Sequence, residues 1–398
     1  MTNLKQNQQL RGSLLNQPLL SVVQNHLISY PTPSNLSGRW NWGVLAGICL
    51  IAQILTGFFL AMHYASSVDL AFNSVQHLMR DVPGGWALRY MHANGASLFF
   101  VVVYRHLFRG MYYTSYAQPR EAVWLLGVII FRLRILTAFI GYVLPWGQRS
   151  LWGSVVITSL ASALPIVGSH IVSWLWGGFS VDNPTLNRFY SFHYMFPFIL
   201  AAASIVHLAA LHHYGSTNPL GITAQVDLVE FYPYFYVKDL VATLGLGILA
   251  AWLVGFEPEL LGHPDNNIPA NPYSTPAHIV PEWYFVWVYA ILRSIPNKLA
   301  GVAAIALVFI TLAMLPYRHK PGVRSPQFRA VHQNRRWCWF GVFVLLTYRG
   351  HQPVEPPYVF RGQFATVAFF VLLGAIRIVA GWEDRVRATV NRPRPNKF

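Results

Sequence analysis

Long apolar runs, separated by short polar segments, recur along most of this 398-residue chain. A run of about 18 or more apolar residues is long enough for a helix to cross the hydrocarbon layer of a bilayer. The pattern therefore predicts an all-α polytopic membrane protein with eight transmembrane helices. The spans are expected at residues 42–63, 86–111, 123–144, 189–211, 237–256, 299–315, 337–348 and 364–380.

The spans divide the chain into two expected regions. Residues 1–220 carry the first four spans and are predicted to form a helical bundle, whereas residues 221–398 carry the last four. An amphipathic stretch at 14–27 is predicted to lie on the membrane surface, and 148–179 to form short surface helices. A loop at 257–298 is dense in proline, asparagine and tryptophan, and loops of this length are usually functional.

Composition supports the membrane interpretation. Hydrophobic residues make up 54% of the chain and charged residues only 11%, against about 25% charged in typical soluble domains. The net charge of +15 raises nucleic-acid binding as a function class, but the basic residues lie mostly in loops and tails, as is usual in membrane proteins. No nucleic-acid partner is therefore expected. Eight spans place both termini on the side that carries most of this positive charge.

The two cysteines limit which cofactors the chain could bind, and the N-terminal segment bears on where the protein is made. Cys49 and Cys338 each lie within an apolar stretch and cannot hold an iron–sulfur cluster by themselves. No Cys-x-x-Cys-His motif occurs, so any haem is expected to bind without a covalent link. The N-terminal segment lacks the pattern of a signal or transit peptide, which fits a protein made in the compartment where it works.

Histidines at matched positions on two spans carry the main chemical signal. His92 and His106 lie fourteen residues apart on the second span, and His193 and His207 have the same spacing on the fourth. Fourteen helical residues rise about 21 Å and return to within about 40° of one face. Two such helices offer two bis-imidazole sites at different depths. By chance, about half a histidine pair at this spacing is expected in the whole chain. Four histidines paired on two membrane spans therefore indicate function.

Glycines repeat this spacing on the other two spans of the predicted bundle. Gly43 and Gly57 lie on the first span, and Gly127 and Gly141 lie on the third, each pair fourteen residues apart. Glycine permits the closest approach of a flat macrocycle to a helix, although small residues also pack membrane helices in general. The joint pattern predicts a four-helix bundle that holds two haems.

Two arginines accompany the histidine pair of the second span. Arg89 and Arg109 each lie three residues from one of these histidines. Their guanidinium groups could bind haem propionates, or the side chains could extend toward the membrane surface instead.

Four further motifs extend the pattern across the chain. They are RYMHANG at 89–95, GYVLPWGQ at 141–148, WGGFSV at 176–181 and PEWY at 281–284. With the histidine pairs, they make the chain resemble the cytochrome b family over nearly its whole length. The chloroplast form of the family spaces its second histidine pair one residue wider and has four spans in that subunit. The eight spans and the lack of bacterial-style insertions make this chain similar to the mitochondrial form, the core subunit of ubiquinol–cytochrome c reductase.

The resemblance implies two non-covalent b-type haems and a ubiquinol/ubiquinone substrate. His92 and His193 would hold a low-potential haem near the outer face, and His106 and His207 a high-potential haem near the matrix face. One electron from quinol would pass to a Rieske iron–sulfur protein, and the other would cross both haems to quinone. Protons would be released outside and taken up inside, which is the Q cycle.

The resemblance also implies a setting and a set of partners. The chain would lie in the lipid of the mitochondrial inner membrane with both termini in the matrix. It would belong to a homodimeric complex that also contains the Rieske protein, cytochrome c1 and other complex III subunits.

The PEWY motif is implied to lie at the site of quinol oxidation, near the outer face. Glu282 would accept a hydrogen bond and then a proton from quinol. A lone carboxylate in an aromatic loop suits this role, because desolvation raises its pKa toward the range of a general base. A surface glutamate and ordinary aromatic packing are the alternatives. The other positions implied to line this pocket are Tyr142, Gly153, Ile157, Tyr284 and Tyr289.

The site of quinone reduction is implied to lie at the opposite face. His212 and Asp239 sit at span ends, where a histidine and a carboxylate could pass protons to reduced quinone. Without the resemblance, Lys238 and Asp239 would be interpreted as a solvated loop pair. The other matching or nearby positions are Asn41, Ser216 and Phe231.

Several arginines fall where the family is usually apolar. They are Arg105, Arg132, Arg134, Arg149, Arg349, Arg361 and Arg377. A buried arginine costs about 2.5–3.5 kcal/mol or more in a membrane unless it has a partner, and the third span has no acidic residue deep inside it. These side chains could face water, bind propionates or lipid phosphates, or be apolar residues in the mature protein because some arginine codons are read differently. We hypothesise the last for Arg132 and Arg134.

Two other function classes remain as alternatives. A two-haem oxidoreductase of the ferric-reductase type also uses paired histidines, but it would need a flavin- and nucleotide-binding domain, and none is visible in the sequence. A channel or transporter would leave the four histidines and the PEWY loop without a role.

Overall fold

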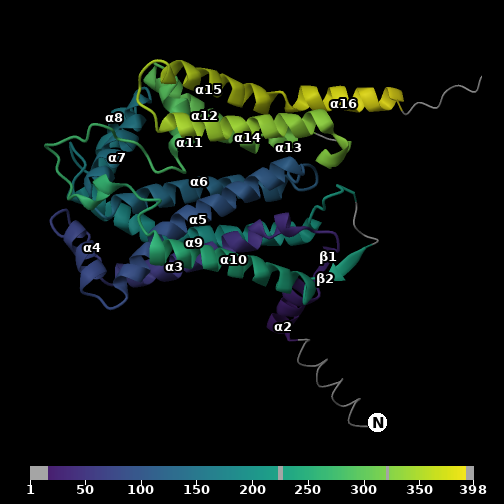
Figure 1. Ribbon diagram of the computed structural model, residues 1–398, viewed down its shortest axis with the longest axis horizontal. Helices are drawn as coiled ribbons and strands as arrows, with labels where there is room; N and C mark the ends of the chain where they lie inside the picture. Colours follow the sequence, from purple (N-terminus) through teal and green to yellow (C-terminus); the bar gives the residue numbers. More distant parts are fainter. Residues whose placement is uncertain (1–16, 223–226, 320–321, 391–398) are drawn as a thin grey trace, which may run out of the picture.

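The computed structural model describes residues 17–222, 227–319 and 322–390. Within these ranges the protein is built almost entirely of helices that run side by side along one long axis (Figure 1). The only sheet among them is a two-stranded antiparallel one that pairs β1 (Pro31–Pro33) with β2 (Leu228–Glu230). The all-α prediction is therefore confirmed, with this small sheet as an addition.

The first four long helices form the predicted bundle. They are α3 (Trp42–Ala61), α5 (Gly85–Tyr112), α6 (Glu121–Val143) and α9 (Asn183–Tyr214). The tightest contacts are between α3 and α5 and between α6 and α9. A capping box fixes the start of α9, because Asp182 and Thr185 satisfy each other's backbone N–H groups, which are otherwise unpaired at a helix N-terminus.

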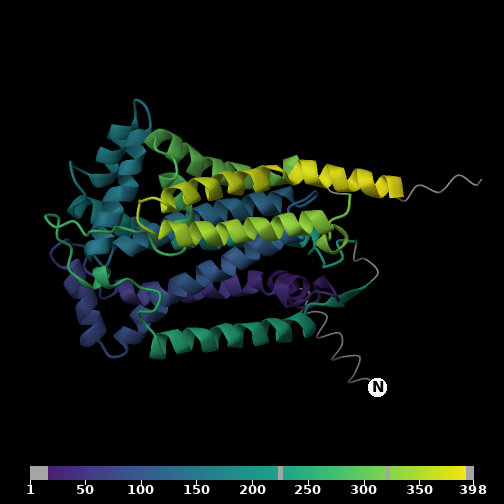
Figure 2. The same ribbon diagram turned by 45° about the horizontal axis from the view of Figure 1, so that its top comes forward.

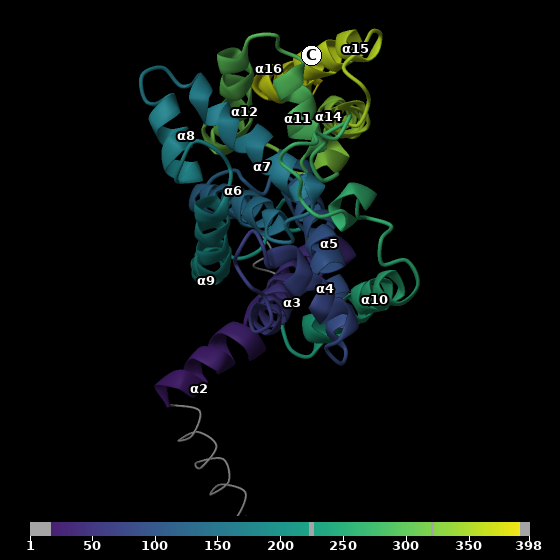
Figure 3. The same cartoon turned by 90° about the vertical axis from the view of Figure 1, so that its left-hand side faces the viewer.

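The remaining long helices lie on either side of this bundle. They are α10 (Tyr234–Phe256), α12 (Lys298–Ala313), α14 (Ala330–Gly350), α15 (Tyr358–Gly374) and α16 (Ile376–Val390). In Figure 3, which looks along the bundle, α10 lies on one side, and α12, α14 and α15 lie on the other. Accordingly, α10 contacts α3 and α5, whereas α12 and α14 contact α6 and α5 respectively.

Each predicted span falls on a helix, so the structure is compatible with eight crossings. In the described part of the chain, α3, α6, α9 and α10 are long and apolar enough to cross a membrane by themselves. A fifth candidate is α15 continued by α16 across a bend of 47°. The helix α12, with 16 residues, is shorter, and charged residues lower the hydropathy of α5 and α14.

Short elements cluster at the two ends of the bundle (Figures 1 and 2). One end carries α4 (Ala71–Arg80), α7 (Gln148–Ser159), η3 (Leu160–Ala163), α8 (Gly168–Trp176), η4 (Pro264–Asn267) and α11 (Val286–Arg293). We call this the loop end. The other end, which we call the sheet end, carries α2 (Pro18–Val23), η1 (Gln24–Ile28), η2 (Gly38–Trp40), α13 (Leu315–Arg318) and η5 (Pro326–Phe328) besides the sheet.

The structure refines three sequence expectations. The predicted surface helix at 14–27 is two short helical segments, α2 and η1, and its first residues lie outside the described ranges. The long loop at 257–298 contains an eight-residue helix, α11. The seventh span is longer than its apolar run, because α14 continues through the polar residues 330–336.

The second half of the chain packs onto the bundle through one large apolar core. Tyr104 of α5 donates a hydrogen bond to the carbonyl oxygen of Tyr284, and Trp287 of α11 donates to the Tyr104 hydroxyl at 2.9 Å. The buried ring of Phe100 stacks on Tyr284 with 4.1 Å between centroids. This core therefore holds the PEWY segment and α11 firmly against the helix that carries His92 and His106.

Candidate functional site

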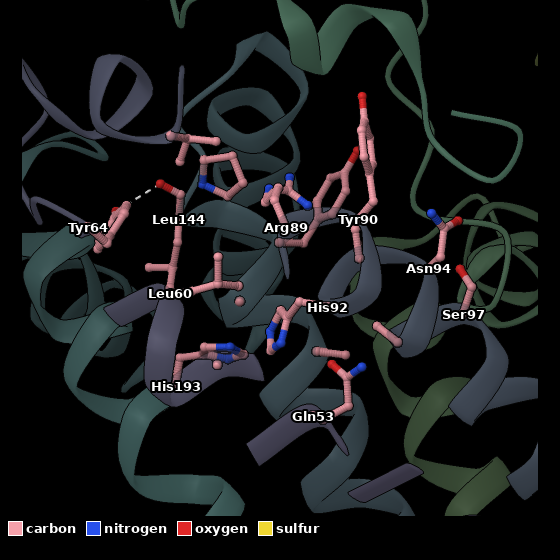
Figure 4. Close-up of a pocket in the computed structure, with 18 of the residues that line it drawn as sticks. Gln53, Leu60, Tyr64, Arg89, Tyr90, His92, Asn94, Ser97, Leu144 and His193 are labelled. Carbon is pink, nitrogen blue, oxygen red and sulfur yellow. Dashed lines mark hydrogen bonds between the residues drawn. The ribbon is translucent and has the colours of Figure 1, made fainter. Parts of the chain in front are cut away.

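The structure brings the four paired histidines together in two opposed pairs. At the loop end of the bundle, the rings of His92 and His193 face each other with 6.1 Å between centroids (Figure 4). Nearer the sheet end, His106 and His207 are 6.4 Å apart. A metal–imidazole bond is about 2.0–2.1 Å, so two rings on opposite sides of one metal ion lie about 6 Å apart. Both pairs therefore fit a bis-histidine haem.

Hydrogen bonds set the tautomer of the pair at the loop end. The Thr56 hydroxyl donates to the carbonyl oxygen of Ala52 at 2.7 Å, so it accepts from the His92 Nδ1 that lies 2.9 Å away. The carbonyl oxygen of Thr137 lies 2.9 Å from His193 Nδ1 and accepts from it. Both rings are thereby left with an unprotonated Nε2, which is the atom a metal needs.

The pair nearer the sheet end is held less tightly. Arg109 Nη2 lies 3.3 Å from His106 Nδ1, and a guanidinium can only donate. The Nδ1 of His207 is buried and interacts with the backbone of Val123, but without a hydrogen bond of ordinary geometry. The hydrogen bonds around this pair are therefore weaker than those around the pair at the loop end.

The four glycines lie opposite the four histidine rings. A Cβ added to Gly57 would stand 3.0 Å from Cε1 of His92, and one added to Gly141 would stand 2.2 Å from Cε1 of His193. At the other level, a Cβ at Gly127 would come within 3.3 Å of His207, and one at Gly43 within 3.5 Å of His106. The glycines thus make room for the rings themselves, most critically at position 141.

A cavity of about 510 Å³ connects the histidine pair of the loop end to the PEWY loop. Its lining includes His92, His193, Arg89, Tyr142 and Glu282. The volume falls within the range of pockets that bind small molecules and cofactors, about 300–1,000 Å³. Figure 4 shows Arg89 next to Tyr90, above the two histidines in this view. The histidine pair of the loop end and Glu282 therefore line one and the same cavity.

Glu282 is buried, with only 7% of its surface exposed. The hydroxyl of Tyr142 faces the carboxyl and interacts with it, although neither this hydroxyl nor Oε1 makes a hydrogen bond of ordinary geometry among the described residues. Burial raises the pKa of Glu282 above its usual value, while Arg149 and Tyr142 oppose this effect. A raised pKa makes this carboxylate a better proton acceptor than a solvated glutamate.

The long loop is pinned to the start of α7. Gln148 donates to the carbonyl oxygen of Ser274 at 3.0 Å and accepts from the backbone N–H of Asn271 at 2.8 Å. Arg149 donates to the carbonyl oxygens of Val280 and Pro281 at 2.7 and 2.9 Å. These bonds position Glu282 at the cavity. Of the other expected pocket residues, Tyr284 also lines the cavity, whereas Gly153, Ile157 and Tyr289 are outside its lining.

The residues expected at the second quinone site gather at the sheet end. Asn41 donates to the carbonyl oxygen of Lys238 at 2.9 Å, and Lys238 donates to that of Leu36. Phe231 stacks on Phe235, and Ser216 and Asp239 lie at the end of α9 and the start of α10. Sequence reasoning did not single out His26 and Tyr30, whose rings contact His212 here. No periodic signal marks these two residues.

The unexpected arginines have very different surroundings. Arg149 is well bonded, as described above. Arg134 is only 3% exposed, lies between the rings of Phe99 and Phe100 at 4.0 and 3.7 Å, and has no partner for either terminal nitrogen among the described residues. Arg105 and Arg132 lie on exposed helix faces, over the rings of Trp42 and Phe309. Of the last three, Arg349 lies over Tyr348 and Tyr358, and Arg361 and Arg377 are exposed.

Comparisons with known proteins agree with this geometry. Residues 27–215 match the family model described as Cytochrome b/b6/petB, and residues 269–370 match Cytochrome b(C-terminal)/b6/petD. A protein named cytochrome b from Marchantia polymorpha is 64% identical over 94% of this chain and 93% of its own length. One from Triticum aestivum is 63% identical over 93% of this chain and 93% of its own length.

A solved structure extends the agreement from sequence to fold. The chain titled "Hyperthermophilic respiratory Complex III" superposes with a TM-score of 0.88 at 32% identity, covering 94% of this chain and 99% of that one. The matched family segments contain all four paired histidines and the PEWY loop. The chain therefore belongs to the cytochrome b family of membrane-bound electron-transfer proteins, whose members bind b-type haem.

Proposed function

We propose that this chain is the cytochrome b subunit of a mitochondrial ubiquinol–cytochrome c reductase and carries electrons across the membrane through two b haems. The observation that carries the proposal is the pair of opposed histidine couples, 6.1 and 6.4 Å between ring centroids, on the same two helices. Fourteen residues along each helix separate the couples by about 21 Å. This stacks two cofactors along the bundle.

Each haem would be held by one histidine from α5 and one from α9. His92 and His193 would hold the outer haem, and His106 and His207 the inner one. When bound, each haem supplies a one-electron centre. Arg89 lines the cavity beside His92, and Arg109 lies at the inner pair, so these guanidinium groups are suited to bind the haem propionates.

Quinol oxidation is proposed at the loop end, in the part of the cavity near Glu282. The Glu282 carboxylate would accept a hydrogen bond from a quinol hydroxyl and then its proton. Its buried position at the cavity supports this role, and Tyr142 and Tyr284 complete the wall around it. Gly153, Ile157 and Tyr289 remain proposed pocket positions on α7 and α11, where a quinone tail would extend.

Quinone reduction is proposed at the sheet end. His212 and Asp239 would pass protons to the reduced quinone, and Lys238, next to Asp239 at the start of α10, would help to bind it. Asn41, Ser216 and Phe231 would shape the site. The separation of the two sites along the bundle means that electron transfer between them also moves charge across the membrane.

The cycle requires partners that this chain does not supply. One electron of each quinol would pass to a Rieske iron–sulfur protein and on to cytochrome c1, while the other crosses the two haems. The proposed setting is a homodimeric complex III in the mitochondrial inner membrane, with both termini in the matrix. The ends of the described chain, α2 and α16, both lie toward the sheet end of the bundle (Figure 1), which supports an even number of crossings.

A direct test is the reduced-minus-oxidised spectrum of the purified complex, followed by quinol-dependent reduction of cytochrome c. We expect a b-type haem signal and activity that is lost in His193→Leu. His213→Leu is a matched control, because the His213 ring contacts Tyr214 instead of another histidine. A complex without b-type haem, or a His193→Leu variant with full activity, would refute the proposal.

A further inference from the structure

A histidine without an assigned role lies against His212 at the sheet end. The Nδ1 of His26, in η1, is 3.0 Å from the Nδ1 of His212, near the end of α9. The two residues are 186 positions apart in the sequence. The fold therefore brings a second imidazole to a site where the sequence led us to expect only a partner carboxylate, Asp239.

The two imidazole rings meet edge to edge and nearly in one plane. Their centroids are 5.2 Å apart, and their planes differ by 10°. The centroid separation exceeds the 3.0 Å between the nitrogens by 2.2 Å (5.2 minus 3.0), which is about twice the distance from a ring centre to its nitrogen. Both nitrogens therefore lie close to the line that joins the two rings, which is the geometry of a straight N–H···N hydrogen bond.

This arrangement can pass a proton from one ring to the other. A neutral imidazole carries its proton on one nitrogen and accepts at the other. In the pair, one Nδ1 donates and the other accepts, so each ring keeps its Nε2 on the far side. A proton that binds at one outer Nε2 can therefore cause another to leave from the opposite Nε2. The side chain of His26 is exposed and that of His212 is half-buried, so the pair leads inward from the surface.

The groups around the pair hold it in place. The ring of Tyr30 stacks on His212 with 4.2 Å between centroids and an angle of 19°, which fixes the plane of the imidazole. Burial raises the pKa of Tyr30 above its usual value, so its phenol stays neutral and does not compete for protons. Arg120 faces Tyr30 and donates to the carbonyl oxygen of Gly215 at 2.9 Å. On α10, the amino group of Lys238 donates to the carbonyl oxygen of Leu36. The next residue, Asp239, is half-buried.

We propose that His26 and His212 form a two-ring proton relay from the aqueous face to the inner quinone site. The inference rests on the proposed function, which assigns quinone reduction to this end. Water gives a proton to His26 Nε2, the Nδ1 proton passes from His26 to His212, and His212 Nε2 gives its proton to an oxygen of the reduced quinone. One transfer leaves His26 with its proton on Nε2 and His212 with its proton on Nδ1, so both rings must return to their starting tautomers by exchanging a proton with water before the next transfer. Two such cycles, with two electrons from the inner haem, turn one quinone into quinol. No electron passes through the imidazoles.

The test uses the purified complex and measures how fast quinone oxidises the pre-reduced inner haem, as a function of pH. We expect His26→Ala to slow this step about 100-fold at alkaline pH, where protons in water are scarce, and much less at acidic pH. Free imidazole added to His26→Ala should restore the rate, because it can occupy the vacated position and carry protons. His26→Asn can still hydrogen bond to His212 but cannot pass a proton, so it should show the same defect.

Controls separate the relay from structural effects. His213→Ala changes the neighbouring residue, whose ring contacts Tyr214, and should keep the unmodified rate and pH profile. A normal rate in His26→Ala, a slow rate that neither pH nor imidazole changes, or loss of the haem spectrum in both His26 variants would overturn the relay. Failure of quinone to oxidise the inner haem in the unmodified complex would instead overturn the proposed function.

Discussion

At the scale of single residues, four glycines leave the space that the histidine rings occupy. The requirement differs between levels: an added Cβ would overlap the His193 ring at position 141 but would only touch the His106 ring at position 43. The sequence pattern identified these positions by their spacing. It could not rank them, because the distance between two helices depends on all the side chains that pack between them.

Gly141→Ala should therefore remove the outer haem and leave the inner one. The His193 ring cannot move aside, because its Nδ1 is bonded to the carbonyl oxygen of Thr137 and a Cβ would lie 2.2 Å from Cε1. Haem absorbance of the purified variant should fall by about half. Gly43→Ala, with 3.5 Å to the nearest ring atom, is the matched control and should keep both haems. Equal spectra for the two variants would contradict this account.

The pH dependence of quinol oxidation should follow Glu282. Burial raises the pKa of this carboxyl, and only the deprotonated form can accept a proton. The rate should therefore rise with pH through this raised pKa. Glu282→Gln should slow steady-state quinol oxidation about 100-fold and remove the rise. Glu257→Gln changes an exposed carboxylate of the same loop and should behave like the unmodified protein. A Glu282→Gln variant that keeps the pH profile would exclude this proton acceptor.

Positions 132 and 134 should carry apolar residues in the mature protein. Arg134 would bury two terminal nitrogens without partners, and Arg132 would extend from the exposed face of a membrane helix. Each arginine in such a place costs about 2.5–3.5 kcal/mol or more. Mass spectrometry of the corresponding peptides should show apolar side chains, whereas Arg293, which donates to the carbonyl oxygen of Gly350 at 3.2 Å, should be a true arginine. Arginine found at 132 and 134 would end this hypothesis.

At the scale of elements, the long apolar helices could be predicted from the sequence and the connections could not. A membrane span can be recognised by its continuous hydrophobicity. Its backbone must satisfy its own hydrogen bonds in lipid, and a helix does this. The helix α11 is different, because its eight residues follow a proline-rich loop and owe their order to packing against α14 and α15. The pairing of β1 with β2 joins residues about 200 positions apart, and no local sequence pattern predicts such a contact.

The contact between α7 and the long loop should control quinol binding. Gln148 holds the loop with both ends of its side-chain amide. Gln148→Leu should free the loop, raise KM for quinol and leave the haem spectrum unchanged, because neither histidine pair touches this residue. Ser159→Ala removes only a bond to Val156 within the helix and serves as the control. Steady-state kinetics that show a lower kcat at constant KM in Gln148→Leu would assign the residue a different role.

At the scale of the whole molecule, the two histidine pairs and the two proposed quinone sites lie along one bundle. The outer pair shares a cavity with Glu282 at the loop end, and His212 stands at the sheet end. The spacing of histidines and glycines predicted the two histidine levels, and the family resemblance implied the places of the two quinone sites. It could not predict the cavity or the meeting of His26 with His212, because both arise from segments that the fold brings together from distant parts of the chain.

The central claim, two haems with one histidine pair each, is tested most directly by redox titration of the b-haem absorbance in the purified complex. The unmodified protein should show two separate one-electron transitions. His193→Leu should lose the outer transition and keep the inner one, and His207→Leu should do the reverse. A single transition in the unmodified protein, or a variant of either pair that retains both transitions, would contradict the account.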